Sequence, residues 1–463
     1  MLTRLKVKGF KSLEDTEVRF GPFTCIAGAN GVGKSNLFDA ILFLKNLAST
    51  SIIEAANNIR NGGKQRISIA SLFTRTVNNQ FETMEFEADM LVNTSVTDDF
   101  LRDAKPKVTF LKYRVVLRYI PSTSTAPEGI QLIDESLKAI PKGKAKDELG
   151  FGPHKIFFES VYVGVSNNDF IYTEVDAGIV KIRQDQVRGA PLSIPIVKAD
   201  RTVLSNINTI ERPTILAARR EMQSWTLLQL ESSSLRKPDD FNSSSTVSEH
   251  GEHLPATLDR LQKNQEIANQ LSCLLPDVKN IHVDVDEQRQ LKTLYLETVN
   301  NIRHEARALS DGTLRFLALS IIGADTEAGR LICLEEPENG IHPARIPAIV
   351  DLLYQMSVDT DVAVDEGNPL RQIIINTHSP LVVQCINAED LIVSHSYKKD
   401  GAVLSEFSPV QDTWRAKDPS STPVAFGMLL DFLKSPADAE IHSNGKDGLN
   451  KIFRLQLDLL SHK

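Results

Sequence analysis

The chain has 463 residues, of which 41% are hydrophobic and 24% are charged, and its formal net charge is −8. A chain of this length can form two or three domain-sized units with a sizeable core, and this composition is typical of a soluble globular protein. The acidic balance excludes a chain that is basic throughout, so any contact with nucleic acid requires a local basic patch.

The cysteines and the N-terminus indicate the compartment. Cys25, Cys273, Cys333 and Cys385 are far apart and form no CxxC pair. That pattern favours a reducing cytosol and argues against a disulfide framework or a zinc site. The first residues, MLTRLKVKGFKSL, contain no apolar signal core, and no stretch is long enough to span a bilayer. We therefore expect a cytoplasmic protein that does not associate with membranes.

Short strands are predicted at the start of the chain, over residues 2–7, 18–20 and 23–27. Directly after the last of them, residues 28–35 read GANGVGKS and match GxxxxGK[ST], the phosphate-binding loop. An amphipathic helix is expected over residues 36–46, so strand, loop and helix occur in the order that such a loop requires.

The residue types of this loop suit a nucleotide. Its glycines let backbone N–H groups curl around phosphate oxygens, and Lys34 can reach the β- and γ-phosphates. Ser35 offers a hydroxyl to Mg²⁺. The sequence therefore predicts a nucleotide site at residues 28–35.

The middle of the chain is rich in β-forming residues, and strands are expected over residues 81–92, 113–119, 155–165 and 170–182. A mobile loop is expected around 141–153; because aromatic residues are not interleaved with its lysines, we interpret it as solvated rather than as a nucleic-acid patch. Residues 194–230 are mixed and mainly helical in pattern. Residues 232–253 are poor in apolar side chains and predict a flexible connection.

The second half opens with an amphipathic helix expected over residues 254–276, followed by strands over 281–285 and 291–299. The sequence LSDGTLR at 309–315 then opens another helix. A Ser-Asp-Gly turn at a helix start can bind an anion, although it is also an ordinary N-cap.

Paired acids follow a short buried strand in LICLEEPENGIHP, residues 331–343. The carboxyl end of a strand in an open α/β sheet is a place for a ligand. Glu335 suits Mg²⁺, and Glu336 can polarise an attacking water. Taken alone, the two acids could equally be a solvated strand end before a turn.

A further strand, residues 371–376, ends at His378. A lone histidine there is usually a satisfied surface or core group, but beside the paired acids it could donate to a terminal phosphate. The remainder, residues 388–463, predicts two short strands and then helices.

Taken together and in this order, GANGVGKS, LSDGTLR, LEEPENGIHP and INTHSP, with GFKSL at the start, resemble the ABC-type ATPases of the SMC, RecF and OLD branch. They resemble in particular the compact "predicted ATPase" group found beside bacterial anti-phage effector proteins. The resemblance covers residues 9–380. It implies an α/β ABC-ATPase head fold, in which a mixed sheet carries the phosphate loop beside an antiparallel β subdomain and a helical subdomain.

The resemblance also implies a division of the chain. The first lobe, with the phosphate loop and the antiparallel β region, takes residues 1–185, and a helical insertion with the Ser-rich connection takes 186–255. The second lobe, with the later motifs, takes 256–410, and a C-terminal helical extension takes 411–463.

Site residues carry over by motif. The phosphates of ATP and its Mg²⁺ would be held by residues of the loop and the first helical turn, namely Gly28, Asn30, Gly31, Val32, Gly33, Lys34, Ser35 and Asn36. Glu335 would contact the metal, as a glutamate where many relatives have aspartate. Glu336 would orient the hydrolytic water, and His378 would sense the γ-phosphate, so Lys34, Glu336 and His378 form the expected catalytic set.

The same resemblance implies that one protomer's site is completed by another. Ser310, Asp311 and Gly312 would contact the γ-phosphate bound to a second protomer, and Asn339 and Gly340 would face that protomer. ATP should therefore drive a head-to-head homodimer, or a higher even-numbered oligomer. The glutamine that couples the lobes in relatives has two candidates, Gln65 and Gln80.

Departures from the family limit the function. No sustained heptads separate the phosphate loop from LSDGTLR, whereas SMC and DNA-repair relatives insert long coiled coils there. After His378, the acids Glu389, Asp390, Asp400 and Glu406 do not form the metal-binding pattern of the OLD nuclease domain, so we expect no nuclease in this chain.

Two functions then remain open. The first is an ATPase that controls a separately encoded nuclease or toxin in anti-phage defence. The second is a RecF-like ATPase that clamps DNA in repair or replication, for which a basic stripe on one face of the dimer would be the sign. A nucleotide-binding scaffold that barely hydrolyses ATP is a third reading, against which Glu336 argues.

Overall fold

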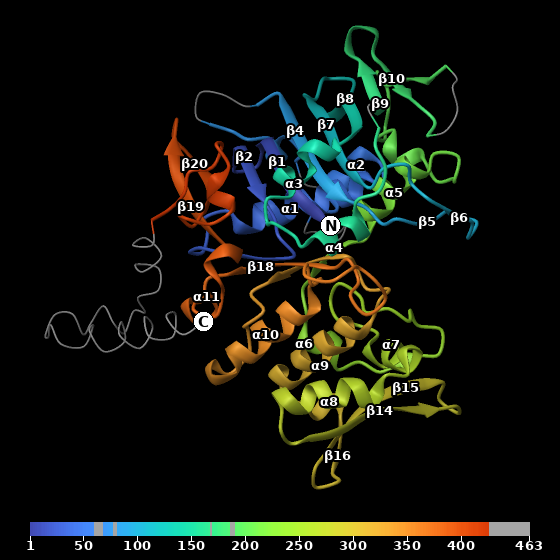
Figure 1. Ribbon diagram of the computed structural model, residues 1–463, viewed down its shortest axis with the longest axis vertical. Coiled ribbons are helices and arrows are strands. Elements are labelled where there is room, and N and C mark those ends of the chain that lie inside the picture. The colour runs from blue at the N-terminus through green and yellow to red at the C-terminus, as the bar shows by residue number, and fades with distance from the viewer. Residues whose placement is uncertain (60–67, 77–80, 167–168, 186–189, 426–463) are drawn as a thin grey trace, which may run out of the picture.

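A computed structural model of the protein describes residues 1–59, 68–76, 81–166, 169–185 and 190–425. Within these residues, a six-stranded sheet crosses the middle of the molecule and separates an upper β-rich layer from a lower helical layer (Figure 1). Its strands, in spatial order, are β12 (Trp225–Leu228), β17 (Leu331–Glu335), β18 (Gln372–Thr377), β3 (Phe23–Ala27), β19 (Leu391–Lys399) and β20 (Ala402–Pro409). The strands from β12 to β19 run parallel, and β20 is antiparallel to β19.

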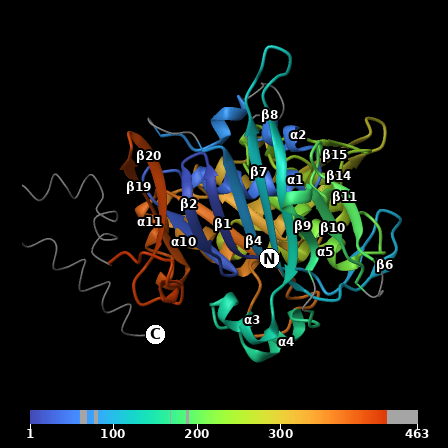
Figure 2. The ribbon, with the colours of Figure 1, turned by 90° about the horizontal axis from the view of Figure 1, so that it is seen from above.

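Above this central sheet lies an antiparallel sheet that Figure 2 shows from its outer side. Its eight described strands, in spatial order, are β11 (Leu192–Pro195), β10 (Ile179–Ile182), β9 (Asp169–Glu174), β8 (Gly129–Ala139), β7 (Phe110–Ile120), β4 (Thr83–Leu91), β1 (Leu2–Phe10) and β2 (Leu13–Arg19). A third sheet at the lower end contains β13 (Asp239–Asp240), β15 (Leu291–Thr298), β14 (Val278–Asp286) and β16 (Arg303–Glu305). A small separate pair is formed by β5 (Val96–Thr97) and β6 (Asp103–Ala104).

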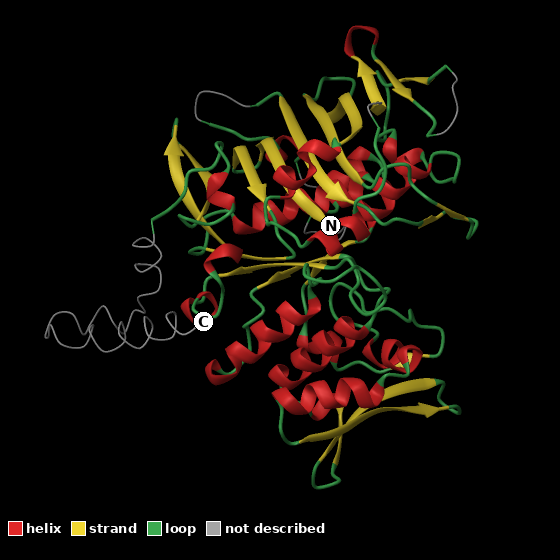
Figure 3. Cartoon of the chain, in the orientation of Figure 1, coloured by secondary structure: helices red, strands yellow, loops and turns green. Residues whose placement is uncertain are grey.

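Helices accompany the strands of the upper layer and make up most of the lower one (Figure 3). Those of the upper part are α1 (Lys34–Leu47), α2 (Ile52–Asn57), α3 (Lys142–Leu149), α4 (Lys155–Val161) and α5 (Pro213–Gln223). Those below or beside the central sheet are α6 (Ser232–Leu235), α7 (Leu254–Leu261), α8 (Asn264–Leu274), α9 (Asp311–Ala324), α10 (Ile346–Met356) and α11 (Pro380–Val383). Among the described residues, none of these helices combines the length and the apolar composition needed to cross a bilayer.

Strand periodicity divides the core in two. Successive side chains of a strand point to opposite faces, so Leu331 and Cys333 of β17 join the upper core while Ile332 and Leu334 join the lower one. A parallel sheet covered on both faces needs such continuous apolar strands. The predicted buried strand before the paired acids is therefore confirmed.

Three aromatic rings centre the upper core. Phe86 lies with its ring centroid 5.3 Å from that of Phe10 and 5.3 Å from that of Phe43, and all three are fully buried. Phe86→Ala should lower the free energy of unfolding by about 3–5 kcal/mol, because a large cavity would replace the ring. Denaturant unfolding measures this loss. Phe100→Ala, at a ring that is 70% exposed, should change stability by less than about 1 kcal/mol. An equal loss in both variants would contradict this account of the core.

The strand expected over residues 155–165 is wrong, because α4 occupies its first part. Phe157, Phe158 and Val161 are buried on one side of this helix. Aromatic and β-branched residues favour strands in general, but here a helix buries these side chains in the small core that α3 and α4 share.

The mobile loop expected around 141–153 is also wrong in its main part, which forms α3. Ala145 and Leu149 lie four residues apart, on the same side of the helix, and both are fully buried. Gly150 ends α3 with a φ of +74°. Two anchoring side chains therefore order a segment whose other positions are polar.

The flexible connection expected over 232–253 is wrong as well, because this segment is folded against the lower layer. Leu235 is buried at 1% exposure, and Asp239 accepts a hydrogen bond from the backbone N–H of Ala256 at 2.9 Å. The backbone N–H of Gln229 donates to the carbonyl of Glu249 at 2.8 Å. A buried leucine and these hydrogen bonds therefore order a stretch that is poor in apolar residues.

The helix expected over 254–276 is present but broken. Gln262 adopts a left-handed backbone, with a φ of +53°, and separates α7 from α8. The expected strand over 170–182 likewise divides into β9 and β10.

The expectations missed β8 and β12, which are strands of the upper and the central sheet. Most of the C-terminal helices expected after residue 411 lie outside the described residues. The domain boundaries at 185, 255 and 410 remain a prediction.

Candidate functional site

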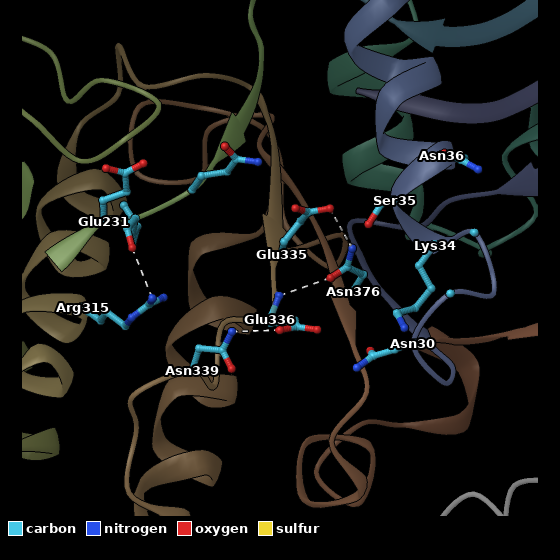
Figure 4. Close-up of a pocket in the computed structure, with 14 residues that line it drawn as sticks. Asn30, Lys34, Ser35, Asn36, Glu231, Arg315, Glu335, Glu336, Asn339 and Asn376 are labelled. Atoms are coloured by element: carbon cyan, nitrogen blue, oxygen red, sulfur yellow. Dashed lines mark hydrogen bonds between the residues drawn. The ribbon is translucent and has the colours of Figure 1, made fainter. Parts of the chain in front are cut away.

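Neighbouring parallel strands of the central sheet end at the same edge and open into a cleft of about 580 Å³ (Figure 4). The phosphate loop follows β3 there, the paired acids follow β17, and Asn376 belongs to β18. The cleft is lined from the loop side by Asn30, Gly31, Gly33, Lys34, Ser35 and Asn36, and from the other side by Gln229, Leu230, Glu231, Arg315, Glu335, Glu336, Asn339 and Asn376. Motifs far apart in the sequence thus meet in one place.

The phosphate loop has the backbone of an anion cradle. Gly31 and Gly33 adopt φ angles of +82° and +93°, and Gly33 is the N-cap of α1. Loops of this kind turn successive N–H groups to one side, toward the positive end of the following helix. Gly28 and Val32 do not line the cleft in this structure, although both were expected to contact the nucleotide.

Lys34 is held inside the loop. Its Nζ donates to the carbonyl of Gly28 at 2.6 Å and to that of Ala29 at 2.8 Å. Burial lowers the pKa of Lys34, and the carboxylates of Glu336, Glu338 and Glu335 act against that shift. The ammonium group therefore sits beside the acids at the position where phosphate oxygens would enter.

Two serines pack beneath the loop. Ser12 Oγ and Ser405 Oγ lie 2.6 Å apart, and Asn36 Nδ2 donates to Ser12 Oγ at 2.7 Å. A Cβ on Gly33 would lie 1.8 Å from Ser405 Oγ. The loop and β20 are therefore packed so closely that only glycine fits at this position.

Gly33→Ala should lower the free energy of unfolding by about 1–3 kcal/mol more than Gly31→Ala does. Both positions carry the strain of a positive φ, which costs roughly 1–2 kcal/mol for a residue with a Cβ. Only Gly33 also meets a neighbour, since a Cβ on Gly31 has no atom within 4 Å. Urea unfolding of the two variants measures the difference, and equal stability would contradict the packing against Ser405.

The second of the paired acids is the centre of a hydrogen-bond network. Glu336 Oε2 accepts from Asn339 Nδ2 at 2.8 Å, and Glu336 Oε1 lies 2.7 Å from His378 Nδ1. Its backbone N–H donates to the carbonyl of Asn376 at 3.0 Å. Burial raises the pKa of Glu336, but the hydrogen bonds from Asn339 and His378 outweigh burial and hold that pKa below its ordinary value. Glu336 thus stays ionised and oriented.

Ser35 and Glu335 supply the oxygen atoms that a divalent cation needs. Both line the cleft, and Figure 4 shows them on neighbouring walls. Asn376 Nδ2 lies 3.4 Å from Glu335 Oε1. Within the described ranges, His, Cys, Asp and Glu side chains form no cluster of three or more that could hold a metal. Mg²⁺ usually takes one or two protein oxygens together with water and substrate phosphates, so this donor set fits it.

Glu338, to which the sequence analysis gave no role, is hydrogen-bonded to the end of β18 beside the site. Its Oε1 accepts from Thr377 Oγ1 at 2.5 Å, and burial raises its pKa. The carbonyl of Thr377 in turn accepts the backbone N–H of Gly28 at 3.2 Å. The ends of β3, β17 and β18 are joined in this way.

Gln229 and Arg315 are among the cleft residues that the sequence analysis missed, with Leu230, Glu231 and Asn376. Gln229 directly follows β12, whose apolar run in the sequence WTLL was the available signal. Arg315 Nη2 donates to the carbonyl of Leu230 at 3.2 Å, across the cleft from the phosphate loop (Figure 4). The earlier glutamine candidates, Gln65 and Gln80, lie outside the described residues.

The turn Ser310-Asp311-Gly312, which the resemblance assigns to a partner's γ-phosphate and which we call the signature turn, does not line this cleft. It lines a separate hollow of about 340 Å³ together with Gly340. Ser310 is the N-cap of α9 and accepts the backbone N–H of Thr313 at 3.3 Å. Asn339, in contrast, lines the main cleft of its own protomer. The phosphate loop and the signature turn therefore line two separate hollows of the described chain.

Comparisons with known proteins agree with the motifs. A family model described as "AAA ATPase domain" matches residues 1–383. The chain is 37% identical over 65 residues to the DNA replication and repair protein RecF of Phocaeicola vulgatus, covering 14% of this chain and 18% of that protein. It is 51% identical over 41 residues to an OLD nuclease of Thermus scotoductus, covering 9% and 8%. These matches span less than a fifth of the length of either relative.

Among solved structures, an SMC head bound to the C-winged helix domain of ScpA gives a TM-score of 0.46 at 14% identity, covering 89% of this chain and 98% of that one. The SMC head domain from Thermotoga maritima gives 0.40 at 14% identity, covering 89% and 99%.

Proposed function

The chain belongs to the AAA ATPase domain family, as an ABC-type member of the branch that contains SMC, RecF and OLD proteins, and from this membership we propose that it binds ATP with Mg²⁺ and hydrolyses the nucleotide. One observation carries the proposal. The phosphate loop with Lys34 lines the same cleft as Glu336, a carboxylate held by Asn339 and His378. Nucleotide binding and water activation are thereby combined.

In this proposal the triphosphate lies on the phosphate loop at the start of α1. Lys34 exchanges its bonds to the carbonyls of Gly28 and Ala29 for the β- and γ-phosphate oxygens. Ser35 and Glu335 would hold Mg²⁺, which when bound would neutralise charge on the phosphates. Gln229 takes the place of the glutamine that couples the lobes, since it lies in the cleft at the end of β12.

Glu336 is the proposed general base. Its ionised carboxylate accepts a proton from the attacking water, and the bond to Asn339 keeps it turned toward the cleft. His378 contacts the same carboxylate from the end of β18, and would donate to the γ-phosphate. His378 would thereby couple the presence of the γ-phosphate to the position of Glu336, the proposed general base.

The active form in this proposal is a head-to-head homodimer. Because the signature turn and the phosphate loop line different hollows, one chain alone leaves Ser310 without a phosphate to contact. A two-fold arrangement places each signature turn over the other protomer's nucleotide. Both composite sites then form together.

We propose that this cytoplasmic ATPase controls a separately encoded nuclease or toxin, as its resemblance to the anti-phage group implies. The RecF-like alternative, binding of DNA across the dimer, needs an unpaired basic surface. On the outer face of the eight-stranded sheet, Arg4 Nε lies 2.5 Å from Glu17, Lys112 lies 3.4 Å from Glu87, and Arg114 pairs with Glu85 at 2.6 Å. The charges of these strands largely satisfy one another, which favours the first reading.

The experiment is phosphate release by the full chain with ATP and Mg²⁺. Turnover should be measurable, and EDTA should abolish it. Lys34→Ala should weaken ATP binding about 10²-fold or more, since a buried charge-assisted contact is lost. Lys45→Ala is the control, because Lys45 lies on the same helix and pairs with Glu249 at 2.5 Å. A wild-type chain that binds no ATP, or equal binding by both variants, would refute the proposal.

A further inference from the structure

The signature turn carries a negative charge where a phosphate is expected. The side chain of Asp311 is 50% exposed at the first position of α9. A hydrogen bond from Arg236, and then one from Ser232, lower the pKa of Asp311, so its carboxylate is ionised at neutral pH. A bare carboxylate would repel the γ-phosphate of a partner's nucleotide.

Arg236 compensates for this charge. Its Nη2 donates to Asp311 Oδ1 at 2.6 Å and to the carbonyl of Leu309 at 2.9 Å. Its Nη1 donates to the carbonyl of Ser232 at 2.9 Å. The guanidinium is therefore fixed at three points, two of them in or beside the signature turn.

The guanidinium of Arg236 has N–H groups that these contacts do not use. Arginine has five N–H groups, and the contacts above use three of them. The side chain is 28% exposed, so part of it reaches solvent. Guanidinium groups fixed in this way are well suited to bind phosphate.

We propose that Arg236 is a phosphate-contacting residue of the composite site, acting in trans: fixed by Asp311, it donates to the terminal phosphate of the nucleotide held by the second protomer. This inference rests on the proposed head-to-head dimer. It assigns Asp311 the role of an anchor for the arginine, with its backbone N–H, and not its carboxylate, free for the phosphate.

The arrangement also separates two arginines by role. Among the described residues, Arg315 is the arginine that lines a protomer's own cleft. Arg236 lines neither that cleft nor the signature hollow, but it is hydrogen-bonded to Asp311 of the signature turn. Both arginines contact the segment after β12, through Leu230 and Ser232. Arg315 belongs to the chain's own nucleotide, and Arg236 to that of its partner.

A mixing experiment tests the trans assignment. Arg236→Ala alone should lose turnover about 10²-fold, the usual cost of one donor to developing charge, and should still bind ATP as the wild type does. In an equal mixture with Lys34→Ala, half of the dimers pair the two variants, and one of their two sites combines an intact phosphate loop with an intact Arg236. Turnover should return to about a quarter of wild type.

If Arg236 instead acts on its own chain's nucleotide, that same site is defective and the mixture stays inactive, which would overturn the inference. The control is a mixture of Lys34→Ala with Ser310→Arg. If this control recovers and the Arg236→Ala mixture does not, the dimer stands and only the role of Arg236 falls. If neither mixture recovers, the proposed composite site itself is wrong.

A second pair of variants separates charge from local structure. Arg236→Lys keeps the cation but not the planar fork and should lose less turnover than the alanine variant, whereas Arg236→Gln keeps hydrogen bonding without the charge and should lose activity as the alanine variant does. Equal turnover of the two would show a structural role and contradict the inference. Lys237→Ala is the matched control, since Lys237 is adjacent, is 55% exposed and pairs with Glu252 at 2.7 Å away from the signature turn.

Discussion

Replacing Glu336 by glutamine should lower ATP turnover about 10²–10⁴-fold, the usual contribution of a general base. The amide cannot take the proton of the attacking water, yet it has nearly the same shape and can still hydrogen-bond Asn339 and His378. ATP binding should therefore persist. Phosphate release and equilibrium ATP binding, measured on the same preparation, check the two halves of this expectation.

The same variant should accumulate as an ATP-bound dimer, since hydrolysis no longer reopens the composite sites. Mass measured by light scattering, with and without ATP, reports this. Glu159→Gln is the control, because Glu159 is an exposed residue of α4, with a side chain that is 63% exposed. Unchanged turnover in Glu336→Gln would remove that residue from the role of base.

Ser310→Arg should reduce ATP turnover about 10²-fold, while each chain still binds ATP. Ser310 lines the signature hollow and not the cleft with the phosphate loop, so its replacement removes the signature hydroxyl from the partner's site without disturbing the chain's own nucleotide. The lost N-cap of α9 should cost only about 1 kcal/mol of stability. Phosphate release, ATP binding and thermal unfolding together test this, and a loss of ATP binding would contradict it.

The site was predictable where chemistry follows strand ends. Parallel strands deliver their last residues to one edge of a sheet, so a loop after residues 23–27, acids after 331–334 and a histidine after 371–376 had to meet if those strands were neighbours. The apolar runs of these strands could be recognised in the sequence, because a strand buried on both faces is apolar at successive positions whichever strand it pairs with.

Residues that act through tertiary contacts were not predictable. Arg236 lies in a Ser-rich stretch interpreted as a flexible connection, and its proposed role depends on its hydrogen bond to Asp311, 75 positions away. Gln229 follows a strand of four residues whose neighbour β17 is about a hundred residues later in the chain. No local pattern reports either pairing.

Residue propensities gave wrong secondary-structure predictions where a few contacts determine the local conformation. In α4, buried Phe157 and Val161 outweigh a β-like composition, and in α3 two buried side chains order a lysine-rich segment. The single left-handed residue Gln262 divides one apparent helix into two. In each case the deciding interaction is a tertiary or backbone term that residue propensities do not contain.

The most direct test of the two-protomer mechanism is ATP turnover in an equal mixture of Lys34→Ala and Ser310→Arg. Each variant alone should be nearly inactive, one for want of nucleotide binding and the other for want of a signature turn. Mixed dimers contain one complete site, so turnover should rise to about a quarter of wild type. If the mixture stays as inactive as its components while Ser310→Arg still binds ATP, each chain does not complete its partner's site, and the mechanism is contradicted.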